Sequence, residues 1–242
     1  MLVPLRPRIH HLLRRAGFDV VRLSAARFPE RRRADLMHRL AIEHVIDVGA
    51  NIGQYIAELR TNAYQGQIVA FEPLSDAFQV LAEKAREDPR LTVYPFAIGA
   101  TEEEAAINVA ENSYSSSLLP MAAVARQATP EASYVGRQHV CVRTLDSFML
   151  PAGWVKIDVQ GSERDVLSGA KCTLQRAKAV EIELSFTTLY EGQLLAWETH
   201  EVLTALGFRL ASLGNAYHDR ATETLLQIDG IYLSARALHT VD

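Results

Sequence analysis

Short apolar runs alternate with amphipathic segments along most of this chain. Apolar runs of strand length lie at residues 44–49, 66–73, 91–99, 154–159 and 179–184. Segments with helical spacing of apolar positions lie between or after them, at residues 53–64, 75–88, 162–177 and 196–205. Strands that alternate with helices predict an α/β fold, in which a mostly parallel sheet is covered by helices on both faces.

Three parts of the chain depart from this alternation. Residues 101–140 are rich in turn-forming residues, with a short edge strand expected near 105–109 and another strand at 140–142. At the carboxyl end, strands near 208–212 and 225–233 flank a polar loop, so they can form an antiparallel hairpin. Ser75 stands where an N-cap of the helix at 75–88 is expected.

The composition is typical of a globular protein in water. Of the 242 residues, 48% are hydrophobic and 22% are charged, and no uninterrupted apolar stretch approaches the roughly 18 residues that a bilayer-spanning helix requires. The two cysteines, Cys141 and Cys172, show no CxxC spacing, which argues against structural zinc. We therefore expect a cytoplasmic protein whose thiols are buried and inert.

Charge divides the chain into two parts. Residues 1–40 hold ten arginines and three acids, a balance of +7, whereas the rest of the chain carries −11. We expect a basic helical arm over residues 1–40 and one main domain over residues 41–242. Two interpretations of the arm stay open. It can rest peripherally on an anionic membrane surface, or it can form a helical hairpin that packs Leu12, Leu13, Phe18 and Val21 against the domain.

The segment VIDVGANIGQY, residues 45–55, has the form of a ligand-binding turn between a strand and a helix. A nicotinamide dinucleotide site would require a third glycine, but only Gly49 and Gly53 are present, with Asn51 between them. Asp47 adds a negative charge that a phosphate would avoid. S-adenosylmethionine, which carries a sulfonium and an ammonium group and no phosphate, fits this turn better.

A second acid ends the next predicted strand. Glu72 can accept hydrogen bonds from two ribose hydroxyls, and it would do so equally for S-adenosylmethionine and for NAD. Both Asp47 and Glu72 have a structural alternative, in which the carboxylate only caps its own loop. The turn therefore indicates the cofactor more strongly than Glu72 does.

Taken together, several motifs give the chain a family resemblance. In order they are VIDVGANIGQY, IVAFEP, FAIG, SYSSSLLP, TLDSF, VKIDVQGSERDVLSGA and EIELSF. Over roughly residues 40–235 the chain resembles the FkbM-type S-adenosylmethionine-dependent methyltransferases. The resemblance implies a class I methyltransferase (Rossmann-like) fold, with a seven-stranded sheet whose last strand is antiparallel. It also implies methyl transfer to a hydroxyl, or sometimes a nitrogen, of a small molecule or sugar.

The same resemblance implies which residues hold the cofactor. The turn and the second strand would contribute Asp47, Gly49, Asn51, Gly53 and Glu72, and the segment Phe96, Ala97 and Ile98 would lie along the adenine. One position departs from the family, which often has an acid where this chain has Gln160. If that position serves as a base in relatives, Gln160 cannot do so here.

Methyl transfer to a hydroxyl needs a group that removes the hydroxyl proton. Asp158, as the base or as a carboxylate that orients the acceptor, is our first candidate, and Glu183 is the second. Period-2 spacing places Asp158 on one face with Lys156, and Glu183 with Glu181. The alternative is a purely structural ion network around Lys156. We expect Glu163 to cap its own turn.

Two loops can complete the site. His218 in the last loop is a third candidate base, and its neighbours Tyr217, Asp219 and Arg220 are candidate acceptor contacts. Residues 111–136 can cover the cofactor and select the acceptor. Asp158, Glu183 and Asp229 could supply oxygen ligands to a metal, but nothing in their spacing demands one, so no metal site is predicted.

These observations favour an S-adenosylmethionine-dependent O-methyltransferase whose acceptor is a small molecule, with a saccharide or glycolipid preferred. The basic arm is what suggests a glycolipid. An NAD-dependent oxidoreductase and a catalytically inactive binding protein of the same fold are the alternatives. A nucleic-acid acceptor is not expected, because the catalytic domain is acidic and lacks the aromatic-rich tetrapeptide of DNA amino-methylating enzymes.

Overall fold

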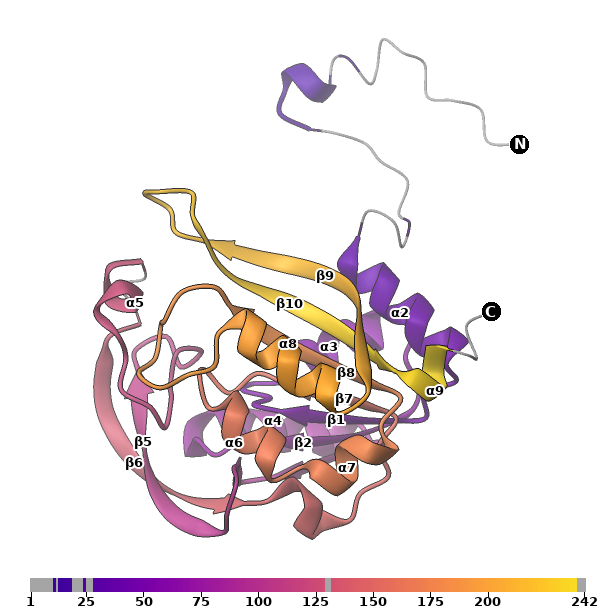
Figure 1. Ribbon diagram of the computed structural model, residues 1–242, viewed down its shortest axis with the longest axis horizontal. Helices are drawn as coiled ribbons and strands as arrows, with labels where there is room; N and C mark the ends of the chain where they lie inside the picture. Colours follow the sequence, from indigo (N-terminus) through magenta and orange to yellow (C-terminus); the bar gives the residue numbers. More distant parts are fainter. Residues whose placement is uncertain (1–10, 12, 19–23, 25–27, 129–131, 239–242) are drawn as a thin grey trace.

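A computed structural model describes residues 11, 13–18, 24, 28–128 and 132–238 of the chain. Its main sheet has seven strands in the order β3-β2-β1-β7-β8-β10-β9 (Figure 1). Their bounds are β1 His44–Val48, β2 Gln67–Phe71, β3 Leu91–Tyr94, β7 Trp154–Ile157, β8 Ala179–Ser185, β9 Phe208–His218 and β10 Leu225–Ser234. The five strands from β3 to β8 are parallel, whereas β10 runs antiparallel to both of its neighbours. This order confirms the predicted sheet with an antiparallel last strand and the carboxyl-terminal hairpin.

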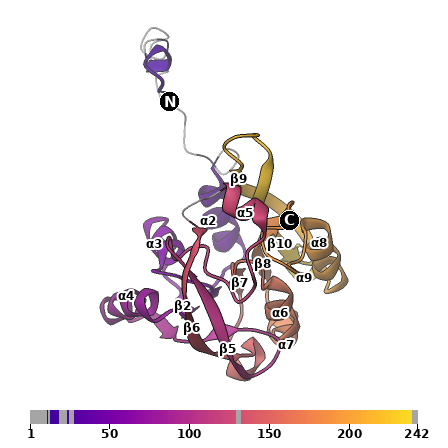
Figure 2. The ribbon, with the colours of Figure 1, turned by 90° about the vertical axis from the view of Figure 1, so that its left-hand side faces the viewer.

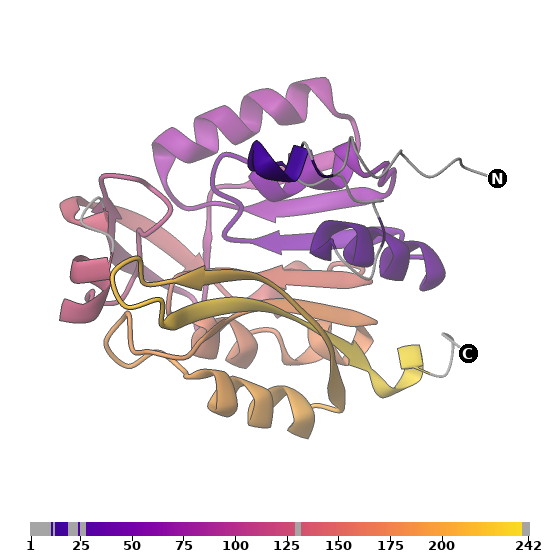
Figure 3. The same ribbon diagram turned by 90° about the horizontal axis from the view of Figure 1, so that it is seen from above.

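Helices cover both faces of this sheet (Figures 2 and 3). One face holds α2 Pro29–Arg39, α3 Gln54–Thr61 and α4 Ser75–Glu87, and the other holds α6 Glu163–Ser168, α7 Lys171–Arg176 and α8 Ala196–Ala205. Alternation along each strand builds a separate core on each face. Val45 and Trp154 pack with α2 to α4, while Ile46 and Ile157 pack with α6 to α8. The short helix α9 Ala235–Leu238 follows β10.

A second, smaller sheet lies next to the carboxyl ends of the strands of the main sheet. It contains β4 Ala97–Ile98, β6 Tyr134–Arg143 and β5 Glu103–Ala110 in that order, and it is accompanied by α5 Ala123–Ala128 and the 3-10 helix η2 Leu145–Phe148. The prediction of one strand over residues 91–99 was therefore wrong. Pro95 lies where the two strands separate, and proline cannot donate the hydrogen bond that would continue a ladder.

Other predicted boundaries also need correction. The helix expected over residues 162–177 is two helices, because α6 ends at Gly169. The Cα of Gly169 lies against the backbone of Gly99, and a Cβ at this position would come 2.0 Å from the Gly99 carbonyl oxygen. Leu74, not Ser75, is the N-cap of α4, and the Ser75 hydroxyl bonds to Gln138 Oε1 at 3.0 Å instead. Strands β6 and β9 are longer than predicted.

The expectation of two buried thiols was also wrong. Cys172 is exposed and Cys141 is only partly buried. Cys141 lies on β6, where its thiol bonds to Glu104 Oε1 on the paired strand β5 at 2.8 Å.

The amino-terminal arm is described in part. Leu36 and Met37 of α2 are buried in the core beside α3, so the end of the arm packs on the domain. Leu12 and Val21 lie outside the described residues, and Phe18 is 66% exposed. The boundary at residue 40 stays a prediction. Within the described part of the chain, no helix combines the length and apolar character needed to cross a bilayer.

Candidate active site

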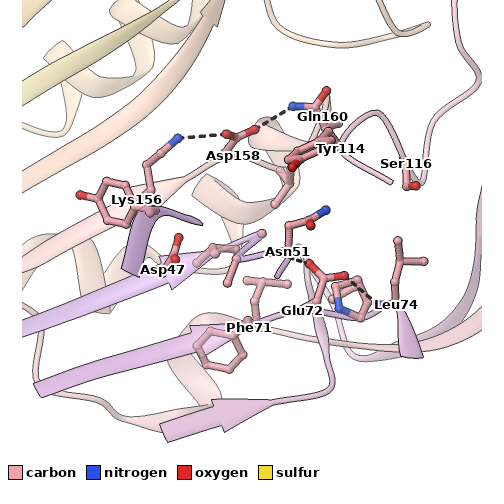
Figure 4. A pocket seen from close by; sticks show the side chains of 18 of the residues that line it. Asp47, Asn51, Phe71, Glu72, Leu74, Tyr114, Ser116, Lys156, Asp158 and Gln160 are labelled. Atoms are coloured by element: carbon pink, nitrogen blue, oxygen red, sulfur yellow. Dashed lines mark hydrogen bonds and ion pairs between the residues drawn. The ribbon is translucent and has the colours of Figure 1, made fainter. Parts of the chain in front are cut away.

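A cavity of about 310 Å³ opens at the carboxyl ends of β1, β2 and β7 (Figure 4). It is lined by the loop after each of these strands, by residues of the second sheet, and by side chains from α2, α3 and the β9–β10 hairpin. In doubly wound sheets, ligands bind at this edge. The first turn, the second acid and the Asp158 loop that the sequence singled out meet here.

The turn after β1 depends on glycine for a steric reason. Gly49 has φ +86°, and a Cβ at this position would lie 1.8 Å from the carbonyl oxygen of Asp158. The absence of a side chain therefore allows the turn to pass against the loop after β7. Gly53, with φ +83°, is the N-cap of α3, and Asn51 between the two glycines has φ +47°. Of these three residues, Gly49 and Asn51 line the cavity.

Asp47 carries a charge that the surrounding protein does not fully compensate. The residue is 1% exposed, and its Oδ2 has no hydrogen-bond partner. Burial raises the pKa of Asp47 to about 7, although Lys156 acts in the opposite direction. A buried carboxylate with an unpaired oxygen is costly unless a donor or cation reaches it. The ammonium group at the methionine end of S-adenosylmethionine is a donor of the kind that this unpaired oxygen could accept from.

Glu72 is oriented by two backbone groups. Its Oε2 accepts from the N–H of Asn51 and its Oε1 from the N–H of Leu74, each at 2.8 Å. Burial nevertheless raises the pKa of Glu72 to about 7. Each carboxylate oxygen has a further lone pair, so the side chain can also accept from a pair of hydroxyls such as those of a ribose.

Apolar side chains surround the part of the cavity next to Glu72. This part suits a flat heteroaromatic ring, because the side chains that form its walls are uncharged. They are Phe71, Leu74, Phe96, Ala97, Ile98, Ile107 and Leu118. The structure thus places Phe96, Ala97 and Ile98 in the wall of the same cavity as Asp47 and Glu72.

A polar wall closes the opposite part. Lys156 Nζ lies 3.1 Å from Asp158 Oδ2 and 3.7 Å from Asp229 Oδ1. The Gln160 amide donates to Asp158 Oδ1 at 2.8 Å and to Glu183 Oε2 at 3.3 Å. Nearby carboxylates raise the pKa of Lys156 despite its burial, so the ammonium form is retained.

The two leading base candidates are thus joined through one side chain, but they differ in position. Asp158 lines the cavity, whereas Glu183 lies behind Gln160 and is not among the lining residues. Burial and the adjacent Asp158 raise the pKa of Glu183 well above its usual range. Glu163, as expected, caps its own turn by accepting from the N–H groups of Val159 and Gly161.

His218 is placed elsewhere. It is exposed near the end of β9, and neither it nor Tyr217, Asp219 or Arg220 lines the cavity. Its catalytic role stays a prediction that this arrangement does not support. The same hairpin instead contributes Asn215 and Asp229, which bond to each other at 3.1 Å.

Two further contributors to the cavity were difficult to find from the sequence. Arg33 of α2 and Tyr55 of α3 reach the cavity and both bond to the buried Glu181. Nothing in the sequence pattern pairs Arg33 with a strand 148 positions away.

From residues 111–136, the predicted cover, Ser113, Tyr114 and Ser116 line the cavity. Among the described residues, no group of three or more His, Cys, Asp or Glu side chains is arranged to hold a metal ion.

The strand order and the glycine turn beside two buried acids define a class I methyltransferase domain. The chain belongs to the FkbM methyltransferase family, because residues 47–210 match the methyltransferase FkbM domain. The family predicted from the sequence motifs is thereby confirmed, and S-adenosylmethionine is the cofactor of this family.

Individual relatives are distant. The chain is 27% identical over 161 residues to the 2-O-methyltransferase NoeI of Sinorhizobium fredii, which covers 62% of this chain and 66% of that protein, just under two thirds of its length. It resembles the crystal structure of methyltransferase FkbM from Methylobacillus flagellatus with a TM-score of 0.48 and 15% identity, over 78% of this chain and 43% of that one. An rRNA methylase from Streptococcus thermophilus gives a TM-score of 0.45 and 10% identity, over 85% and 96% of the two chains.

Proposed function

We propose that this protein is an O-methyltransferase that transfers a methyl group from S-adenosylmethionine to a hydroxyl of a saccharide or of a glycolipid head group. The observation that carries the proposal is the unpaired, buried carboxylate of Asp47, which shares one cavity with Glu72 and with Asp158. When bound, S-adenosylmethionine supplies a methyl group activated by its sulfonium. The residues around it then have to orient the acceptor and remove one proton.

Asp158 is the residue that takes the proton of the acceptor hydroxyl in this proposal. Its side chain is 34% exposed and lines the cavity, so an acceptor can reach it. Lys156 Nζ lies 3.1 Å from Asp158 Oδ2, and the second carboxylate oxygen faces the Gln160 amide. Proton removal as the new bond forms is what turns an aliphatic hydroxyl into an adequate nucleophile.

A polyhydroxyl acceptor agrees with the chemistry of the wall. Asp158, Asp229 and Asn215 present carboxylate and amide groups side by side, and such groups pair with adjacent hydroxyls. The name of the relative, a 2-O-methyltransferase, describes transfer to oxygen by that protein. The preference for a glycolipid rests on the +7 charge of residues 1–40, which favours an anionic surface.

Calorimetric titration with S-adenosylmethionine and, separately, with NAD tests the cofactor. We expect binding of the first ligand alone, weakened in Asp47→Ala and in Glu72→Ala. Binding of NAD alone would indicate the oxidoreductase instead. Transfer of tritiated methyl groups is then measured with methyl glycosides of glucose, galactose, mannose and rhamnose, and with a glycosylated lipid in vesicles. Cofactor binding without transfer to any of them would favour an inactive binding protein.

A further inference from the structure

Gln160 occupies an unusual position in the loop after β7. Its backbone has φ +54°, a left-handed conformation that residues other than glycine, asparagine and aspartate adopt rarely. The next residue, Gly161, has φ +100°, and a Cβ there would lie 2.7 Å from Tyr190 Cβ. These two residues hold the backbone of the loop closely against Tyr190.

Every polar atom of that side chain has a partner. The amide nitrogen donates to Asp158 Oδ1 at 2.8 Å and to Glu183 Oε2 at 3.3 Å. The amide oxygen accepts from the hydroxyl of Tyr190 at 2.8 Å. This orientation agrees with the chemistry of the neighbours, because carboxylate oxygens accept and the tyrosine hydroxyl can donate.

Asp158 is therefore held from both sides. Gln160 bonds one carboxylate oxygen, and Lys156 Nζ lies 3.1 Å from the other. A carboxylate held by two donors has little rotational freedom, which is the condition for efficient positioning of a reacting group. Figure 4 shows the three side chains in a row along the cavity wall.

The same residue also contacts the segment that covers the cavity. The carbonyl oxygen of Gln160 accepts from the hydroxyl of Ser117 at 2.6 Å, and the hydroxyl of Tyr190 lies 3.3 Å from the carbonyl oxygen of Ser115. Residues 113–117 include Ser113, Tyr114 and Ser116 of the cavity lining. Hydrogen bonds thus connect this cover to the residue that holds Asp158.

We propose that Gln160 is a positioning residue for methyl transfer, whose amide fixes the Asp158 carboxylate and links it to the cover at residues 113–117. This inference rests on the proposed function, in which Asp158 takes the acceptor proton. An amide suits the role better than an acid. Glutamate at this position would put a third carboxyl between Asp158 and Glu183 and could not donate to both.

Two variants separate the hydrogen bonds from the charge. Gln160→Met keeps the length of the side chain and removes its polar atoms, and Gln160→Glu keeps the shape but adds a carboxyl. Thr173→Val is the control, because it removes a buried hydroxyl that bonds to Asp146 Oδ1 at 2.7 Å, away from the cavity. Each variant is assayed for unfolding in urea, for the Kd of S-adenosylmethionine and for methyl transfer to the glycosides named above.

For Gln160→Met we expect kcat to fall about 10- to 100-fold, while the Kd of S-adenosylmethionine stays within about threefold of the wild-type value. For Gln160→Glu we expect the pH of half-maximal rate to rise by about one unit or more, because a third carboxyl disfavours ionisation of the cluster. The titratable groups that face this position are Asp158, Glu183, Glu163, Lys156, Asp229 and Tyr190. In Thr173→Val, kcat should stay within about twofold even though stability falls.

The inference is overturned if wild-type protein is active but Gln160→Met keeps kcat within about threefold, or if the pH profile of Gln160→Glu superimposes on that of the wild type. A wild-type protein that binds S-adenosylmethionine and methylates none of the acceptors would overturn the proposed function, and the role of Gln160 with it. The activity of the wild type therefore distinguishes the two failures.

Discussion

Asp47 and Lys156 are register partners on the neighbouring strands β1 and β7, and both are buried on the sheet face that α2 and α3 cover. Lys156 nevertheless directs its amino group to Asp158 and Asp229, and Asp47 Oδ2 keeps no hydrogen-bond partner. The domain thus contains a cation and an anion on adjacent strands, in which the cation contacts Asp158 and Asp229 while one oxygen of the anion has no protein donor.

Asp47→Asn is predicted to weaken cofactor binding without destabilising the fold. The Kd of S-adenosylmethionine should rise at least about tenfold, because the amide has no charge for the ligand ammonium. The free energy of unfolding without ligand, measured in urea at pH 8, should stay equal or rise, since a poorly compensated buried charge is removed.

Asp146→Asn is the matched control for this variant. Asp146 accepts from the N–H groups of Cys172 and Thr173 at the start of α7 and does not line the cavity. It should lose about 1 kcal/mol of stability as a weakened cap and bind the cofactor normally. A loss of stability in Asp47→Asn as large as in Asp146→Asn would show that the Asp47 carboxylate serves the fold instead.

The pH dependence of stability and of binding should have opposite signs. The pKa values of Asp47 and Glu72 are about 7 in the folded protein, raised by burial above ordinary values of 3.8 and 4.5. The folded protein therefore binds more protons than the unfolded chain between about pH 4 and pH 7, so the free energy of unfolding should decrease as the pH rises through this window.

Cofactor binding needs the carboxylates in their ionised form. The Kd of S-adenosylmethionine should therefore rise as the pH falls below about 7, by at most about tenfold per pH unit for each carboxyl involved. Calorimetry between pH 6 and pH 8.5 measures this slope, and Asp47→Asn should reduce it. A Kd that is independent of pH over this range would show that neither carboxyl titrates near 7.

How far the sequence predicts this molecule depends on how local each signal is. The strands of the main sheet, the glycine turn, Asp47 near the end of β1 and Glu72 just after β2 could be predicted, because each is encoded within about ten residues. The sequence also placed Lys156 and Asp158 on one face, and they bond at 3.1 Å. Pairings between distant segments could not be predicted. Neither the Arg33–Glu181 pair nor the contribution of Asn215 to the cavity leaves a periodic pattern.

Gly49→Ala is predicted to unfold or strongly destabilise the domain. Its new methyl group would lie 1.8 Å from a backbone oxygen of Asp158, which no rotamer change can relieve. Gly207→Ala isolates the conformational part of the cost, because Gly207 has φ +86° and no atom within 4 Å of its Cβ position. That control should lose only about 1–2 kcal/mol. Thermal and urea unfolding compare the two, and equal losses would contradict the steric explanation.

Removing one partner of the buried Arg33–Glu181 pair should destabilise the folded protein more than replacing both partners. Arg33 Nε bonds both carboxylate oxygens of Glu181 at 2.9 and 2.8 Å, and Tyr55 and Trp154 also donate to that carboxylate. Arg33→Met leaves a buried charge without its cation, so a loss of about 3–5 kcal/mol is expected. Adding Glu181→Gln removes that charge and keeps an acceptor for Tyr55 and Trp154, which should restore more than half of the loss.

The exposed pair of Arg143 and Glu102, at 3.1 Å, provides the control for a surface contact. Arg143→Met should cost less than about 1 kcal/mol, because solvent screens exposed charges. All variants are compared by urea denaturation at pH 7.5 without ligand. If Arg33→Met costs no more than Arg143→Met, helix α2 is not anchored through Glu181. If Glu181→Gln adds to the loss of stability, the destabilisation comes from the lost contacts of Arg33 and not from the uncompensated charge.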